Sequence, residues 1–364
     1  MSAAADQVRT FTVAPDDDGI RLDRWFKRNL PDASFNLVSR WARTGQLRVD
    51  GKRAAPGDRI LAGQTIRVPP AEAPTTAPRA RPERPRLSED QIAFVNEMVI
   101  HRDPQAIVVN KPPGLATQGG TKTKEHLDGL LDGLSDDAGN RPKLVHRLDK
   151  DTSGVLLLAR TARSAAFFSK SFSGRTARKI YWALVVGVPE VRDGLIDLPL
   201  AKQPGTGGEK MHVDEEEGLV ARTRYRMIDR AGDRTTWIEL QPLTGRTHQL
   251  RVHMAAIGHP IVGDGKYGGQ DAFLTGAISR KLHLHARRLR IDHPDGERID
   301  VLADPPAHFA DSLANLGFDP AMGDLPIDEV KYGETAEGKK RAVASAAKAR
   351  RKERKGERRS RGRR

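Results

Sequence analysis

The strongest constraint on how this chain can fold is a proline-rich segment at residues 69–86, with the sequence PPAEAPTTAPRARPERPR. It contains six prolines, no aromatic residue and no alternating apolar pattern. Because proline fixes φ and lacks an amide donor, such a segment forms a semi-rigid extended spacer. The sequence therefore predicts two separately folded parts, at residues 13–68 and 91–320, joined by a linker at residues 69–90.

The first part has the pattern of a small α/β module. Apolar residues recur at helical spacing in residues 22–30 and again at residues 38–41, which predicts two short helices. Asp50 and Gly51 are typical of a hairpin turn, and residues 65–68 read as a closing strand.

The two predicted helices also carry several cations, which suggest a polyanion-binding face: Arg24, Lys27, Arg40 and Arg43. The alternative is an ordinary helical subdomain with a solvated basic surface.

The second part is rich in short apolar runs that read as strands, at residues 106–109, 155–159, 181–186, 236–240 and 284–291. Helical patterns are fewer, at residues 125–134, 164–172 and 248–257. Strands outnumber helices without a regular alternation of the two. This pattern predicts an α+β fold with a mostly antiparallel, mixed sheet.

The net charge of +14 is concentrated near the C-terminus. Residues 337–364 contain 14 Lys or Arg and three Glu, so they carry +11 and leave only +3 on the other 336 residues. This segment has too few apolar groups to form a core, so a disordered basic tail is expected. Fourteen cations would release many counterions on binding RNA, and the tail is therefore predicted to be an RNA-contacting arm.

The chain contains no cysteine, which excludes disulfides, a thiol nucleophile and cysteine-ligated metal sites. The first residues, MSAAADQVRT, contain no apolar signal region, and no apolar run reaches about 18 residues. A cytoplasmic protein without membrane contact is therefore expected.

The sequence KLVHRLDKDTSGVLLLAR, at residues 143–160, combines a polar loop with a buried-looking strand. Strands that flank a loop hold catalytic groups in fixed positions while the loop reaches the substrate. Asp149 lies between Arg147 and Lys150, and nearby cations favour an ionised carboxylate, which suits a nucleophile. Two alternatives remain from the residues alone: a structural turn aspartate, and a hydrolytic pair formed by Asp149 and Asp151.

The HRLDKDTSG loop resembles the signature loop of the RluA-type pseudouridine synthases, which isomerise uridine within RNA. The resemblance continues for about 200 residues through four further motifs, in the order found in that family: VVNKPPGL, RKIYWALVVG, PLTGRTHQLRVHMAAIGHPIVGDGKYG and LHLHARRL. Residues 13–68 resemble the alpha-L RNA-binding domain of longer, RluC- or RluD-like members. The resemblance implies the pseudouridine synthase fold for residues 91–320.

The resemblance also implies roles for individual residues. Asp149 corresponds to the catalytic aspartate, Tyr181 to the tyrosine that packs against the target base, and Arg251 to the basic residue that pairs with the aspartate. Arg147 corresponds to an arginine beside the flipped nucleotide, and we also expect the adjacent His146 to contact RNA.

The isomerisation requires neither a metal nor a cofactor, and none is expected. The histidines at positions 248, 253, 283 and 285 have spacings found in some metal sites, but no HExxH motif accompanies them. Structural hydrogen bonds or RNA contacts are the favoured interpretation.

The sequence thus predicts a monomeric RNA pseudouridine synthase that acts on large-subunit ribosomal RNA through Asp149. Transfer RNA is the alternative substrate. The alternative function is that of a catalytically silent RNA-binding or ribosome-assembly factor. The residues do not decide whether Asp149 attacks C1′ or C6, or stabilises a glycal.

Overall fold

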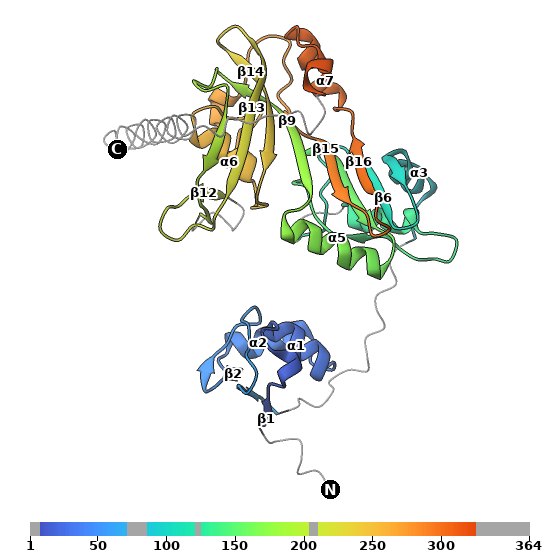
Figure 1. Cartoon of the computed structure of the whole chain (residues 1–364), viewed down its shortest axis with the longest axis vertical. Helices are drawn as coiled ribbons and strands as arrows, with labels where there is room; N and C mark the ends of the chain where they lie inside the picture. Colours follow the sequence, from blue (N-terminus) through green and yellow to red (C-terminus); the bar gives the residue numbers. More distant parts are fainter. Residues whose placement is uncertain (1–7, 71–85, 121–124, 204–209, 325–364) are drawn as a thin grey trace. The chain divides into compact units, whose positions relative to one another are not determined.

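A computed structural model describes residues 8–70, 86–120, 125–203 and 210–324 (Figure 1). The chain divides into two compact units, Met1–Pro85 and Arg86–Arg364. The division falls inside the predicted linker. The proline-rich residues 71–85 and the basic tail at residues 337–364 lie outside the described residues.

The N-terminal unit is a four-stranded antiparallel sheet with the order β1-β4-β2-β3, accompanied by two helices. Its core includes the aromatic side chains of Trp25, Phe26 and Trp41. The elements are β1 (Arg9–Thr12), η1 (Pro15–Asp17), α1 (Leu22–Asn29), α2 (Phe35–Arg43), β2 (Arg48–Val49), β3 (Lys52–Arg53) and β4 (Thr65–Val68).

Both expected helices and the hairpin are present in this unit. Ser34 caps α2 by accepting a hydrogen bond from the Leu37 amide at 3.3 Å. Asp50 and Gly51 have φ values of 48° and 76°, as the two central residues of a type I′ hairpin turn require. The unit begins earlier than predicted, because β1 precedes residue 13 and pairs with β4.

The second unit contains a ten-stranded sheet whose main path is β10-β13-β14-β9-β15-β8-β6-β5, with β16 paired to β15 and β7 to β8. Its strands are β5 (Val99–Arg102), β6 (Ala106–Lys111), β7 (Lys143–Leu144), β8 (Ser153–Ala159), β9 (Arg178–Val186), β10 (Asp193–Asp197), β13 (Arg222–Ala231), β14 (Thr235–Pro242), β15 (Leu284–Asp292) and β16 (Arg298–Leu302). The strands β11 (Leu200–Lys202) and β12 (Met211–Val213) form a separate hairpin.

Helices cover both faces of this sheet (Figure 1). They are α3 (Glu89–Glu97), α4 (Leu127–Leu130), η2 (Leu131–Leu134), α5 (Ala162–Gly174), α6 (Gln249–Ala256), η3 (Gly269–Ala272), α7 (Ala307–Asn315) and η4 (Pro320–Gly323). Phe168 of α5 packs against β6 and β8, Leu250 and Met254 of α6 pack against β9 and β14, and Phe309 of α7 packs on the opposite face of these two strands. Because both faces are buried, β8 reads as a nearly continuous apolar run, whereas β14 is buried along its whole length although it includes Thr, Glu and Gln.

The predicted α+β class with a mostly antiparallel sheet is confirmed, since the one parallel pairing in the described sheet joins β15 to β8. All five predicted strands are present. The helix expected at residues 125–134 is two short turns, α4 and η2. Within the described ranges, no helix combines the length and the apolar character needed to cross a membrane.

Candidate active site

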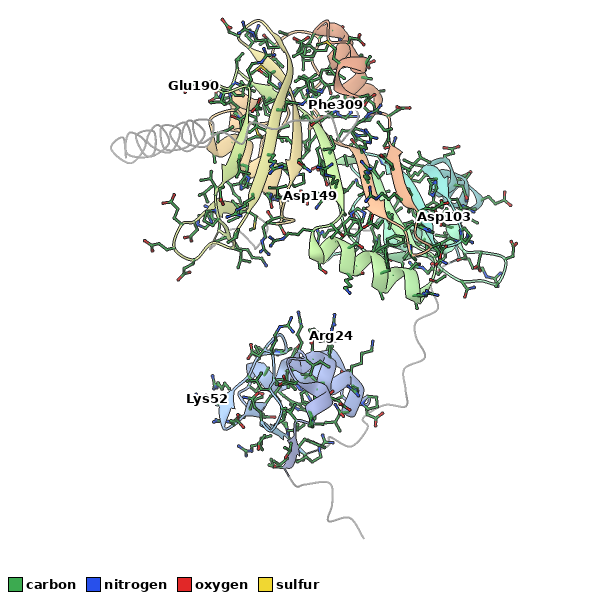
Figure 2. All side chains as sticks on the ribbon, in the orientation of Figure 1. Arg24, Lys52, Asp103, Asp149, Glu190 and Phe309 are labelled. Atoms are coloured by element: carbon green, nitrogen blue, oxygen red, sulfur yellow. The ribbon has the colours of Figure 1, made fainter. Side chains whose placement is uncertain are left out.

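Asp149 lies in the loop that joins β7 to β8, in the middle of the second unit (Figure 2). The loop ends where β8 meets β15, with Ser153 opposite His285 and Gly154 opposite Ala286. Gly154 has a φ of 110°, and a Cβ there would collide with the Ala286 carbonyl oxygen. Only glycine lets the chain enter the sheet this close to β15.

The loop is held on both sides of Asp149. Thr117 donates a hydrogen bond from Oγ1 to the Leu148 carbonyl at 2.7 Å and accepts one from the Leu148 amide at 3.2 Å. On the other side, the Lys150 carbonyl accepts from the Gly114 amide at 2.9 Å. These contacts leave the Asp149 side chain 21% exposed on a fixed backbone.

Lys111, the last residue of β6, contacts the same loop. Its ammonium is fully buried and donates to the carbonyls of Pro112, Leu115 and Lys150, at 2.9, 2.8 and 3.1 Å. Burial lowers the pKa of Lys111 to about 7, although the negative charges of Asp151 and Asp149 oppose this shift. The VVNKPPGL segment thus supports the loop that carries Asp149.

Tyr181 of β9 lines the cavity beside Asp149 and packs against the apolar cores of both halves of the sheet. Burial, and then the charge of Asp149, raise the pKa of its hydroxyl well above the ordinary value. Lys179, two residues earlier on the same face of the strand, also lines the cavity, and burial lowers its pKa.

Arg251, on α6, does not have the partner predicted from the sequence. Its guanidinium makes a bidentate pair with Asp264, with two nitrogen–oxygen distances of 2.7 Å, instead of pairing with Asp149. Burial acts to lower the pKa of Arg251, but the hydrogen bonds and charge of Asp264, followed by the charge of Asp149, raise it. Asp264 thus fixes the geometry of Arg251.

We expect Asp264→Ala to lower the free energy of unfolding by about 3–5 kcal/mol, because it leaves the buried Arg251 charge without a partner. Asp300→Ala is the matched control, since Asp300 makes the same bidentate contact with Arg288 near the surface, where such a pair contributes about 0–1 kcal/mol. Urea unfolding of both variants measures the difference. Equal losses would contradict the assignment of Asp264 as the essential partner.

The two residues expected to contact RNA in this loop differ in their surroundings. Arg147 is exposed and lines the cavity. His146 also lines the cavity, but its ring stacks on Phe172 at 4.1 Å between centroids, and its Nε2 accepts from the Leu157 amide at 2.9 Å. Burial, followed by the charge of Lys179, lowers the pKa of His146 to about 3, so the ring is neutral at physiological pH.

The cavity has a volume of about 960 Å³, near the upper end of the range of about 300–1,000 Å³ typical of ligand sites. Asp149 is the one acidic side chain among the described residues that line it. Eight cationic side chains line the same space: Arg147, Arg175, Arg178, Lys179, Arg222, Arg224, Arg246 and Arg251. The arrangement suits a polyanionic substrate that presents one reacting group to one carboxylate.

Asp151 is exposed and is not among the residues that line the cavity, so the geometry does not favour a hydrolytic pair with Asp149. The four histidines considered as metal ligands have other partners, which are Tyr267 for His248, Thr223 and Leu198 for His253, Ser312 for His283, and Ser153 and Ala303 for His285. No group of three or more potential ligands capable of holding a metal ion is found in the part of the chain that the structure describes.

The four cations predicted to bind RNA in the N-terminal unit are all exposed, with Arg24 and Lys27 on α1 and Arg40 and Arg43 on α2. Figure 2 shows Arg24 projecting from the surface of this unit.

Several residues of the site were not identified in the sequence, notably Lys111, Lys179, Asp264 and Tyr267, whereas His248 was expected to make a structural hydrogen bond or an RNA contact. One signal was available, because Lys179 and Tyr181 share a strand face at a spacing of two. The partners Asp264 and Tyr267 follow Arg251 by 13 and 16 residues, a separation that no helical or strand period predicts.

Known proteins resemble this chain over most of its length. Residues 105–256 match the sequence family described as RNA pseudouridylate synthase. An uncharacterised RNA pseudouridine synthase of Synechocystis is 34% identical, over 84% of this chain and 91% of that protein. The mitochondrial RNA pseudouridine synthase 4 of Arabidopsis thaliana is 39% identical, over 80% of this chain and 75% of that protein.

Two further comparisons concern a ribosomal enzyme and a solved structure. The ribosomal large subunit pseudouridine synthase C of Vibrio cholerae is 30% identical, over 87% of this chain and 99% of that protein. The structure of human RNA pseudouridylate synthase domain containing 4 matches with a TM-score of 0.53 and 29% identity, over 63% of this chain and 97% of that one.

Proposed function

This chain belongs to the RNA pseudouridylate synthase family and is an RNA pseudouridine synthase, and we propose that it isomerises uridines of large-subunit ribosomal RNA with Asp149 as the catalytic carboxylate. One observation supports the assignment of Asp149. Among the described residues that line the cavity, it is the one carboxylate, and it lies there with eight cations. Phosphates of RNA neutralise the cations, and Asp149 is left to act on the target nucleotide.

The reaction breaks the bond between ribose C1′ and N1 of uracil and forms a bond between C1′ and C5. The hydrogen leaves C5 and N1 gains one, so the atoms balance without a redox partner. Because the reacting atoms are inaccessible within a base stack, the uridine must be flipped into the cavity. Asp149 then acts on C1′ or C6, or stabilises a glycal.

Tyr181 serves as the platform for the flipped base. Stacking on an aromatic ring contributes about 1–3 kcal/mol per base and tolerates rotation of the base in its plane. The raised pKa of Tyr181 keeps the phenol protonated, which makes a phenolate base unfavourable at neutral pH. Its hydroxyl is therefore a hydrogen-bond donor in the ground state.

The remaining RNA contacts come from exposed cations. Arg147 lies at the cavity and can fill the space that the flipped nucleotide leaves in the stack. The cations on α1 and α2 bind further phosphates of the RNA. Such contacts position the RNA and contribute salt-dependent affinity.

Ribosomal RNA is proposed as the substrate because relatives that span most of this chain are named as synthases of the large ribosomal subunit. Transfer RNA remains the alternative substrate. A catalytically silent binding factor is disfavoured by family membership and by the presence of Asp149, Tyr181 and Arg251 in one cavity. The cytoplasmic location and the monomeric state expected from the sequence stay predictions.

The test is incubation of the full chain with unmodified transcripts of large-subunit ribosomal RNA and of transfer RNA, without added cofactor. Pseudouridine is expected in the ribosomal transcript and is measured by mass spectrometry of nucleosides and site mapping. Product in transfer RNA alone would overturn the substrate assignment. A variant with Ser in place of Arg24, Lys27, Arg40 and Arg43 should bind the ribosomal transcript more weakly, and unchanged affinity would contradict the proposed RNA-binding face.

A further inference from the structure

His248 immediately precedes α6 and lies between Asp149 and Tyr267, a tyrosine with no role in the proposed reaction. Its Nε2 is 3.9 Å from Oδ2 of Asp149. Its Nδ1 is 2.6 Å from the hydroxyl oxygen of Tyr267. The same hydroxyl oxygen accepts a hydrogen bond from the Met211 amide of β12 at 3.1 Å.

These contacts favour one of the two neutral tautomers of His248. The Met211 amide can only donate, so the Tyr267 oxygen accepts there and has one hydrogen to donate elsewhere. His248 Nδ1 is the acceptor within reach of that hydrogen. A neutral imidazole whose Nδ1 accepts carries its hydrogen on Nε2, the nitrogen that faces Asp149.

The charges around His248 are mixed. Asp149 approaches it from the catalytic loop, Arg251 from α6, and Asp264 and Lys266 from the segment before Tyr267. Burial lowers the pKa of His248, and the positive charges of Arg251 and Lys266 act in the same direction. The two carboxylates oppose this shift. The neutral form, with one donor directed at Asp149, is consistent with this balance.

The backbone at His248 is held in an unfavourable conformation. Its φ of 52° lies in the left-handed region, which residues other than glycine adopt rarely and often at functional sites. Gln249 secures this turn, because its side chain accepts from Thr244 Oγ1 and the Arg246 amide and donates to the Arg222 carbonyl and Thr223 Oγ1. The turn directs the imidazole into the cavity instead of along the helix.

We propose that His248 is a positioning residue for Asp149, and that Tyr267 acts by fixing its tautomer. When RNA fills the cavity, the 3.9 Å separation closes to a hydrogen bond from Nε2–H of His248 to Oδ2 of Asp149, which orients the carboxylate toward the nucleotide. The Met211 amide connects this arrangement to the β11–β12 hairpin. The inference rests on the proposed function, in which Asp149 is the catalytic carboxylate.

The test compares His248→Gln, His248→Leu and Tyr267→Phe under single-turnover conditions with the ribosomal transcript. Glutamine places an amide donor near the position of Nε2, whereas leucine has no donor, and both have the same backbone cost at a positive φ. We expect the rate of the leucine variant to fall at least about 10-fold, because the hydrogen bond to a charged group is lost. The rate of the glutamine variant should stay within about 3-fold of the wild-type rate.

Tyr267→Phe removes only the hydroxyl and keeps the ring that Arg251 contacts, with the guanidinium carbon 5.1 Å from the ring centroid. Its rate should fall about 3- to 10-fold. Tyr225→Phe is the matched control, because Tyr225 is buried in the same unit and does not line the cavity. The dissociation constant for RNA should change by less than about twofold in every variant, since the effect is on orientation and not on affinity.

Equal rates for His248→Gln and His248→Leu, whether both are normal or both are slow, would overturn the positioning role. An unchanged rate in Tyr267→Phe would overturn the role of the tautomer. An Asp149→Asn variant that remains active would instead refute the proposed function. The two failures are therefore distinguishable in one assay.

Discussion

Replacing Asp149 with asparagine is expected to reduce the rate of pseudouridine formation at least about 1,000-fold, as loss of an essential catalytic group does in other enzymes. Asparagine has nearly the same shape but neither the negative charge nor the nucleophilic oxygen pair. Binding of the ribosomal transcript should persist, because the change removes the one acidic group from a cavity lined by eight cations and leaves every described cation in place.

The matched control is Asp151→Asn, two residues away in the same loop. Asp151 is exposed and does not line the cavity, so its replacement should change the rate by no more than about twofold. Single-turnover rates and RNA dissociation constants of both variants make the comparison. An equal loss in the two variants would favour the paired-carboxylate mechanism, and full activity in Asp149→Asn would remove this residue from the reaction.

The position of Asp149 could be predicted from the sequence because the features that place it are local. The polar loop and the apolar strand that follows it are contiguous in the sequence. The strands β6, β8 and β9 could be predicted in the same way, since burial on both faces produces apolar runs in them. β13 was missed even though Arg222 and Arg224 alternate with buried residues, a signal of period two.

The support of the site could not be predicted, because it depends on contacts between distant segments. Lys111 reaches the carbonyl of Lys150, 39 residues away, and Arg251 turns to Asp264. Before the fold is known, a lysine is expected to be exposed. An arginine can pair with any of several aspartates, and the sequence does not say which of them lies beside it. Arg251 was therefore assigned the wrong partner.

The net charge of the chain also failed to predict the local charge of the cavity. The net charge of +3 outside residues 337–364 suggested a nearly neutral folded region. Yet the described residues that line the cavity include eight cations and one carboxylate from separate elements, among them the Asp149 loop, β9, β13 and α6. A net charge is a sum over the whole surface, so it hides a local excess that only the fold brings together.

Acidification is expected to unfold the second unit between about pH 6.5 and pH 4, because it contains histidines that are buried in the neutral form. His253, His283 and His285 are fully buried, and burial lowers the pKa of each to about 4. The pKa of an unfolded histidine is about 6.5. In this interval the unfolded chain binds a proton at each of these three histidines that the folded chain does not, and His146, with a pKa of about 3, adds to the difference, so stability falls as the pH falls.

Each histidine contributes about 1.4 kcal/mol per pH unit in this interval, and the three together about 4 kcal/mol per unit. The contribution of these neutral histidines to the stability of the folded unit is fully present above pH 6.5. It is lost progressively as the pH falls to 4. Since domains are stable by about 5–15 kcal/mol, unfolding is expected before the folded histidines can be protonated. Urea unfolding at a series of pH values measures the slope directly.

His253→Gln is the variant that tests the assignment of these protons. His253 Nε2 lies 3.0 Å from the Leu198 carbonyl and must donate to it, while Nδ1 lies 2.9 Å from Thr223 Oγ1 and accepts from it. Protonation of Nδ1 would break the second bond. Glutamine can keep the donor to Leu198 but does not titrate, so the slope of stability against pH should fall by one proton. A wild-type slope near zero above pH 5 would show that the buried histidines accept protons without unfolding, in which case carboxylate protonation at lower pH would govern acid stability.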